Sequence, residues 1–203
     1  MTEIYQRVSS LFKKYGIKSV TMDDIARELG ISKKTLYAYT QDKNDLLDKI
    51  IQYETNVREK ELAAEVGKKG DAILQLFRIM ALANKQLQGY SAVFQYDLKK
   101  YYPAIHDKLK ESSRRIMYGA IYKNIEKGIR EGLYRKDLQA EVIAKLHLSR
   151  LEKIPEENLI TIEEYVSENY FREVFEYHIR GIANEEGLKI LAEILKDNKT
   201  EKV

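Results

Sequence analysis

Apolar residues recur at spacings of three and four along almost the whole chain, a pattern typical of amphipathic helices. No segment shows the strict alternation of apolar and polar positions that a half-buried strand requires. The fold class that we predict is therefore all-α. The pattern predicts helices over the ranges 3–15, 22–29, 33–39, 43–66, 71–88, 91–100, 104–131, 138–151, 158–182 and 185–197.

The three short helices at the N-terminus have the spacing of a helix-turn-helix. Thr21 and Ser32 stand where the N-caps of the second and third helices are expected. Gly30 between them allows the positive φ of a tight turn. Ala26 is small where the two helices would cross, and Leu36 would fill the gap between them.

The predicted third helix has a face that this packing leaves outside. In a major groove the first residues of such a helix reach base edges, while lysines meet phosphates. On a short helix alone these residues would more often belong to an ordinary solvated surface, but the spacing of Ala26, Gly30 and Leu36 and the capped preceding helix favour DNA binding. The face consists of Lys33, Lys34, Thr35, Tyr37 and Tyr39.

The overall charge adds little to this interpretation. The chain carries a net charge of +3, whereas proteins that coat nucleic acid nonspecifically usually carry far more. Residues 1–50 hold nine Lys and Arg against seven Asp and Glu, a net of +2. Binding to DNA would therefore depend on where the lysines lie, and the third helix is locally positive.

The stretch from Thr21 to Tyr39, TMDDIARELGISKKTLYAY, is followed by DKNDLL at positions 42–47. Together they resemble the DNA-binding domain of TetR-family transcriptional regulators. The resemblance covers residues 2–51, about a quarter of the chain. Members of this family are homodimers with a DNA-binding head and a divergent helical ligand-binding body. The resemblance therefore implies a helix-turn-helix DNA-binding domain over residues 1–48 and a larger helical ligand-binding and dimerisation domain over 49–203.

The resemblance also implies roles for single residues of the head. Thr21 and Lys43 would each touch a phosphate, from the starts of the second and fourth helices. The chain departs from the family at Thr40, where an aromatic residue is common, and at Lys34, where a small one is. Thr40 affects the packing between the third and fourth helices. Lys34 adds charge at the DNA surface, so the operator preference does not follow from the resemblance. The implied DNA contacts are Thr21, Ser32, Lys33, Lys34, Thr35, Tyr37, Tyr39 and Lys43.

Residues 71–182 are rich in tyrosine, and a buried tyrosine hydroxyl needs a hydrogen-bond partner. Such a composition suits a polar-lined cavity or an interface, although the same side chains could form an ordinary core. The resemblance implies a ligand pocket between the middle helices of the body. The candidates for its lining are Phe77, Met80, Tyr90, Phe94, Met117, Tyr118, Ile121, Tyr122 and His147.

Several chemistries have no residues to support them. The chain has no cysteine, which excludes disulfides, thiolate metal sites and cysteine nucleophiles. Its histidines, His106, His147 and His178, include no pair three or four positions apart, so we predict no metal site. Glycine-rich phosphate loops and nucleophile elbows are also missing from the sequence. We therefore expect a binding protein without a cofactor and not an enzyme.

The last two predicted helices carry apolar stripes. In the TetR family two late helices of each subunit form a four-helix bundle, which implies a homodimer through the C-terminal helices. A monomer that hides these stripes in its own core is the alternative. The stripes consist of Ile160, Ile162, Val166, Tyr170, Val174 and Tyr177, then Leu188, Leu191, Ile194 and Leu195.

The function predicted from the sequence is that of a dimeric transcriptional repressor, released from a palindromic operator of double-stranded DNA by a small-molecule effector. Alternatives are a DNA-binding activator or architectural factor without ligand control, and a helical protein-interaction module. The first thirty residues lack the apolar core of a signal peptide, and no apolar stretch approaches the roughly 18–20 residues of a membrane span. We therefore expect a cytoplasmic protein without a membrane partner.

Overall fold

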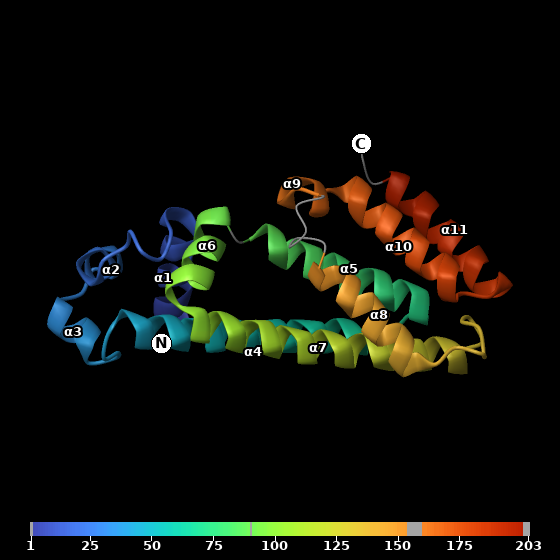
Figure 1. Ribbon diagram of the computed structural model, residues 1–203, viewed down its shortest axis with the longest axis horizontal. Coiled ribbons are helices and arrows are strands. Elements are labelled where there is room, and N and C mark those ends of the chain that lie inside the picture. Colours follow the sequence, from blue (N-terminus) through green and yellow to red (C-terminus); the bar gives the residue numbers. More distant parts are fainter. Residues whose placement is uncertain (1, 90, 154–159, 201–203) are drawn as a thin grey trace. The chain divides into compact units, whose positions relative to one another are not determined.

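The computed structural model describes residues 2–89, 91–153 and 160–200 (Figure 1). Within these ranges there is no strand, and one antiparallel bridge joins Tyr134 to Ala183. The predicted all-α fold class is confirmed. The helices are α1 (Thr2–Tyr15), α2 (Met22–Leu29), α3 (Lys33–Tyr37), α4 (Lys43–Gly67), α5 (Ala72–Gln88), α6 (Ala92–Tyr101), α7 (Pro103–Arg130), α8 (Ala140–Lys153), α9 (Ile162–Tyr165), α10 (Glu168–Ile182) and α11 (Glu185–Thr200).

The observed helices follow the predicted ones closely, with two differences. The third helix ends at Tyr37 instead of continuing to Tyr39. The single helix predicted over 158–182 is wrong, because α9 and α10 are separate helices. Ser167 makes the break: its Oγ accepts the Tyr170 backbone N–H at 3.2 Å and so caps a new helix. Residues 158 and 159 lie outside the described part.

The chain divides into two compact units. Unit 1 consists of residues 1–60 and 88–113, and unit 2 of residues 61–87 and 114–203. The long helices α4 and α7 each contribute residues to both units. The boundary after residue 48 that the resemblance implies stays a prediction.

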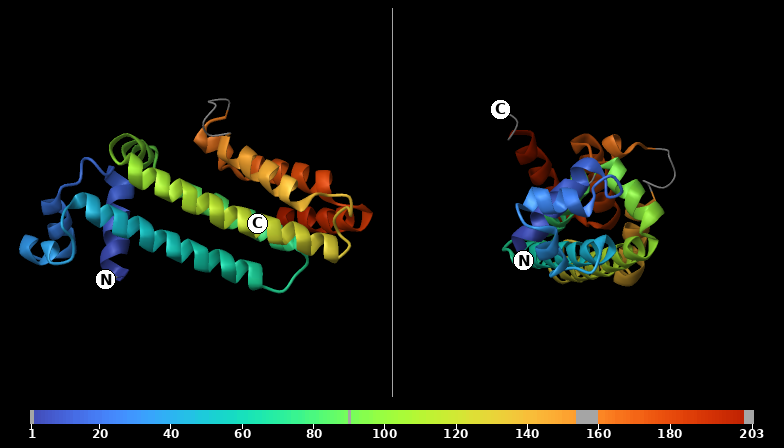
Figure 2. Two further views of the ribbon diagram at one scale, coloured as in Figure 1. Left: turned by 60° about the horizontal axis from the view of Figure 1, so that its bottom comes forward. Right: turned by 90° about the vertical axis from the view of Figure 1, so that its left-hand side faces the viewer.

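Unit 1 is built around the apolar faces of α1, α2, α3, α6 and the first turns of α4, which α1 crosses (Figure 2). Val8 and Phe12 of α1 are fully buried in this core. Gly16 ends α1 with φ +83°, and a Cβ there would lie 2.6 Å from Cγ1 of Val93. Glycine is therefore favoured at this turn, because another residue would be strained at this φ and its Cβ would force the Val93 side chain to shift. The core also contains Ile17, Val20, Ile25, Ala26, Leu36, Leu46, Leu47, Ile50, Ile51, Phe94, Leu98 and Ile105.

In unit 2, α5, α10 and α11 pack around Tyr134, which is completely buried; α10 and α11 lie side by side (Figure 1). The Tyr134 hydroxyl donates to Oδ1 of Asn124 at 3.1 Å. Asn124 Nδ2 in turn donates to Oε1 of Gln75 and to the Ala72 carbonyl, each at 2.8 Å. Gln75 Nε2 donates to the Val66 carbonyl at 2.7 Å. This buried network joins the end of α4 to α5, α7 and the turn after α7.

Within the described ranges, no helix combines the length and the apolar character that a membrane span would need.

Candidate DNA-binding surface and effector site

Side-chain caps fix both helices of the helix-turn-helix. Thr21 Oγ1 accepts the Asp24 N–H at 3.1 Å, and the Asp24 carboxylate accepts the Thr21 N–H at 2.9 Å. Gly30 ends α2 in the left-handed conformation with φ +68°. Ser32 Oγ then accepts the Thr35 N–H at 3.0 Å and starts α3. Each such cap stabilises a helix by about 1 kcal/mol, so the entry into α3 is fixed by its own sequence.

The orientation of α3 agrees with the expectation from the sequence. Leu36 is fully buried in the core of unit 1, and the rest of the helix faces outward. Tyr37 and Tyr39 are 45% and 42% exposed, respectively. The structure thus brings the predicted contact residues of α3 and its flanks onto one exposed surface, and their contact with DNA stays a prediction. These residues are Ser32, Lys33, Lys34, Thr35, Tyr37 and Tyr39.

The two lysines of α3 differ in their electrostatic surroundings. Lys33 Nζ lies 2.8 Å from Oδ1 of Asp23 on α2, and this hydrogen bond raises the pKa of Lys33. Lys34 is exposed and has no carboxylate partner among the residues that the structure describes. Among the described residues, a carboxylate therefore partly neutralises the charge of Lys33 but not that of Lys34.

Lys43 at the start of α4 is partly buried. Its Nζ donates to the Lys18 carbonyl at 3.3 Å and lies 6.0 Å from the centre of the Phe12 ring. Burial lowers the pKa of Lys43, an effect that Asp97 and Asp24 partly oppose. The ammonium group has three N–H donors and this bond uses one of them, so a phosphate contact is compatible with it and stays a prediction.

At Thr40, where the family commonly has an aromatic residue, the structure has a cluster of hydrogen bonds that the sequence did not reveal. Thr40 is buried, and its Oγ1 lies 2.8 Å from the Asp42 carbonyl and 2.9 Å from Oδ2 of Asp45. The Asp45 carboxylate also accepts from Lys49 Nζ and the Gln41 N–H, each at 2.8 Å. These hydrogen bonds, that of Lys49 above all, lower the pKa of Asp45 to about 2. A polar cluster therefore joins α3 to α4 where the family commonly has an aromatic ring.

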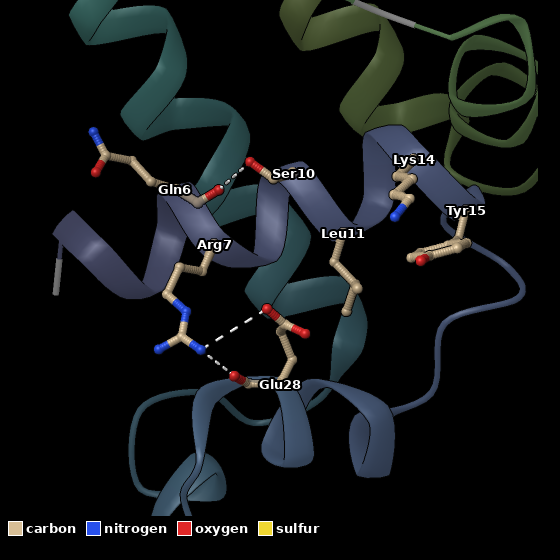
Figure 3. A pocket seen from close by; sticks show the side chains of 7 residues that line it. All are labelled: Gln6, Arg7, Ser10, Leu11, Lys14, Tyr15 and Glu28. Atoms are coloured by element: carbon tan, nitrogen blue, oxygen red, sulfur yellow. Dashed lines mark hydrogen bonds and ion pairs between the residues drawn. The ribbon is translucent and has the colours of Figure 1, made fainter.

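A groove between α1 and α2 has a volume of about 330 Å³ (Figure 3). Arg7 points across it and donates to the Glu28 carbonyl, with the Glu28 carboxylate 3.8 Å away. The guanidinium is therefore already paired from within the chain. We assign no ligand to this groove, whose lining residues are Gln6, Arg7, Ser10, Leu11, Lys14, Tyr15 and Glu28.

The candidates for a ligand pocket belong to different hydrophobic clusters of the two units. Phe94 is buried in the core of unit 1, whereas Phe77 and Met80 pack in unit 2 against α10. Phe77 has its ring centre 5.4 Å from that of Phe171. Tyr90 lies outside the described residues. A second group in unit 2, between α7 and α8, contains Met117, Tyr118, Ile121 and Tyr122.

His147, the remaining candidate, lies against His178, with their ring centres 3.9 Å apart. No sequence pattern indicated this pair, because the two residues belong to different helices, α8 and α10. Among the described residues, no three side chains of the metal-ligating types come close enough to hold an ion.

The apolar stripe predicted on the last helix lies inside unit 2. Leu191 and Ile194 of α11 are buried there. Large apolar side chains are exposed instead on α8, at Val142 and Leu146, and on α10, at Tyr177, which is 73% exposed. Val142 and Leu146 were not among the residues predicted for an interface, although their spacing of four places them on one helix face.

The fold and the capped, outward-facing α3 define the class of protein: an all-helical chain with an N-terminal helix-turn-helix of the DNA-binding type. Comparison with known proteins specifies the family. Residues 9–50 match the sequence model of "Bacterial regulatory proteins, tetR family". This part of the chain is therefore a TetR-family DNA-binding domain.

A curated relative and two solved structures are similar to this chain. The HTH-type transcriptional regulator SAB2452 of Staphylococcus aureus (strain bovine RF122 / ET3-1) is 44% identical over 46 residues, which span 23% of this chain and only 25% of that protein. A transcriptional regulator of Cytophaga hutchinsonii ATCC 33406 has 20% identity and a TM-score of 0.74 over 90% of this chain and 98% of its own.

A transcriptional regulator of Saccharomonospora viridis, solved in complex with choline, has 20% identity and a TM-score of 0.66 over 90% of this chain and 96% of its own. At these identities the two structural similarities establish a shared fold. The chain thus has the TetR-type arrangement of an N-terminal helix-turn-helix and a helical C-terminal part.

Proposed function

We propose that this chain is a cytoplasmic, dimeric transcriptional repressor that binds a palindromic operator and leaves it when a small molecule binds unit 2. The observation that supports DNA binding best is the surface of α3. Its N-terminus is capped, its apolar side chain points inward, and it presents lysines, a threonine and tyrosines outward. In a major groove this arrangement offers hydrogen bonds to base edges and a charge to phosphate.

Binding-site selection from random duplex DNA tests this function, followed by footprinting of the selected sequence. We expect an inverted repeat, with half-sites separated by about one helical turn, 10–10.5 base pairs, or a multiple of it. This spacing follows because each of the two subunits would place one α3 in the groove. Selection of no sequence, or of a single half-site bound by one subunit, would contradict the proposal.

Effector control is the second part of the proposal, and the choline-bound neighbour supports it by fold. In this chain α4 begins beside the helix-turn-helix and supplies its last residues to unit 2. A ligand that favours one position of α4 would change the separation of the two recognition helices. Allosteric coupling of this kind typically amounts to about 5–150-fold in affinity, which footprinting with and without an effector would measure.

Dimerisation is proposed through the exposed apolar side chains of α8 and α10. We expect Leu146→Glu to convert the dimer into a monomer, because it places a charge in the proposed apolar interface. Sedimentation velocity at micromolar concentration measures the change. Tyr96→Glu is the matched control, since Tyr96 is a similarly exposed apolar residue on α6 in unit 1. A Leu146→Glu protein that sediments as the wild type does would exclude this surface.

A further inference from the structure

Two buried histidines of unit 2 lie in ring-to-ring contact. His147 of α8 is 2% exposed and His178 of α10 is 8% exposed. Their ring centres are 3.9 Å apart, with 49° between the ring planes. Burial lowers the pKa of His147 to about 2 and that of His178 to about 3, and Arg150 adds to the effect. Both rings are therefore neutral at physiological pH.

Polar atoms of this cluster have no partner among the residues that the structure describes. They are Nε2 of His147, Nε2 of His178 and Nε of Arg150. Buried polar groups in folded proteins are nearly always hydrogen-bonded, because an unsatisfied one costs the free energy of its desolvation. Three such atoms in one small region therefore indicate a missing partner.

The hydrogen bond between Arg150 and His147 identifies what kind of partner is missing. Arg150 Nη2 lies 3.4 Å from Nδ1 of His147. A guanidinium can only donate, so Nδ1 accepts and the proton of the neutral His147 ring is on Nε2. Nε of Arg150 is also a donor. At least two of the three unpartnered atoms thus require an acceptor.

The positive charge of Arg150 also calls for a partner that accepts hydrogen bonds. Its guanidinium is half-buried, with its central carbon 5.6 Å from the centre of the Tyr177 ring, and no carboxylate of the described residues pairs with it. The neighbouring groups that act on its charge are the tyrosines Tyr165, Tyr170 and Tyr177. A half-buried cation without a counter-ion is unfavourable and would attract an anion. A metal ion is excluded by the same features, since it would meet a positive charge and a protonated Nε2.

We propose that Arg150, His147 and His178 form the anion-binding part of the effector site in unit 2, and that the effector is a small organic carboxylate. Its carboxylate would accept from Arg150 and from Nε2 of His147, beside the aromatic rings of α9 and α10. The regulatory meaning of this site depends on the proposed function, whereas the binding itself does not.

The test uses the full-length protein without DNA, labelled with ¹⁵N, and follows the imidazole nitrogens by NMR. The probes are benzoate and its uncharged analogue benzamide. We expect benzoate to shift the Nε2 resonances of His147 and His178 saturably, with a dissociation constant at least tenfold lower than that of benzamide. Arg150→Met should abolish the response. The matched control is Arg180→Met, because Arg180 is an exposed arginine of α10 paired with Glu176.

A second measurement needs no ligand. The double variant His147→Leu, His178→Phe removes two of the three unpartnered polar atoms and leaves Nε of Arg150. We therefore expect the melting temperature of the ligand-free protein to rise by about 2–4 °C. A fall in melting temperature would show that the pair is a satisfied structural network and would overturn the proposal. So would a missing benzoate response, an equal response to benzamide, or an unchanged response in Arg150→Met.

The outcomes separate this proposal from the proposed function. If the wild-type protein selects an inverted repeat but does not bind benzoate, the proposed function is supported and the proposed anion site is contradicted. If the protein binds benzoate through Arg150 but selects no DNA sequence, the anion site is supported and the proposed function is contradicted.

Discussion

The variant Lys34→Glu is expected to bind its operator about a thousandfold more weakly than the wild type. The estimate starts from the salt dependence of DNA binding, in which each phosphate neutralised by the protein contributes about 0.9 to the slope of log K against log[salt]. At about 0.1 M salt this corresponds to roughly eightfold in affinity for each phosphate that a lysine neutralises. In a dimer the substitution removes this neutralisation at two phosphates, and the reversed charge adds repulsion at both. Fluorescence anisotropy with labelled operator DNA at 50–200 mM salt measures the affinity and the slope.

The substitution leaves α3 itself intact, which makes the result specific to DNA. Lysine and glutamate have similar helix propensities, and a carboxylate in the first turn interacts favourably with the helix dipole. Lys34 is exposed and supports no described ion pair. Lys123→Glu is the matched control, because Lys123 is an exposed lysine of α7 in unit 2 and its reversal changes the net charge equally. The control should bind the operator nearly as tightly as the wild type. If Lys34→Glu also binds less than tenfold more weakly than the wild type, Lys34 does not bind a phosphate.

The sequence predicted most of what local interactions determine. The caps at Thr21 and Ser32 and the left-handed Gly30 depend on residues within three or four positions, and all three are observed. The inward orientation of Leu36 follows from the period of an amphipathic helix. Hence the helices of the head and its exposed face could be obtained from the sequence alone.

Contacts between distant segments could not be obtained in this way. Nothing local distinguishes Phe94, which packs in unit 1, from the aromatic residues of unit 2. The stripe of α11 has the same period whether it meets a second subunit or, as observed, its own core. The contact between His147 and His178 depends on how α8 lies on α10. A helical period indicates which face is buried, but not which surface covers it.

The buried network of Asn124 is a further long-range feature, and its removal is expected to have the largest effect on stability. Asn124→Ala would leave the Tyr134 hydroxyl and the Gln75 Oε1 without their partner in a fully buried environment. Two unsatisfied groups at about 1–3 kcal/mol each, together with a small cavity, reduce the free energy of unfolding by about 3–5 kcal/mol. Thermal unfolding followed by circular dichroism should show a melting temperature about 10 °C lower.

Tyr134→Phe is the matched control, because it removes one hydroxyl from the same network and keeps the ring that packs against Gly128. The hydrogen bonds from Asn124 to Gln75 and to the Ala72 carbonyl remain, so we expect the free energy of unfolding to fall by only about 1 kcal/mol. Equal decreases in the two variants would mean that the tyrosine hydrogen bond alone accounts for the network's stability. A much larger decrease in Asn124→Ala would instead identify Asn124 as the residue that holds α5 and α7 together in unit 2.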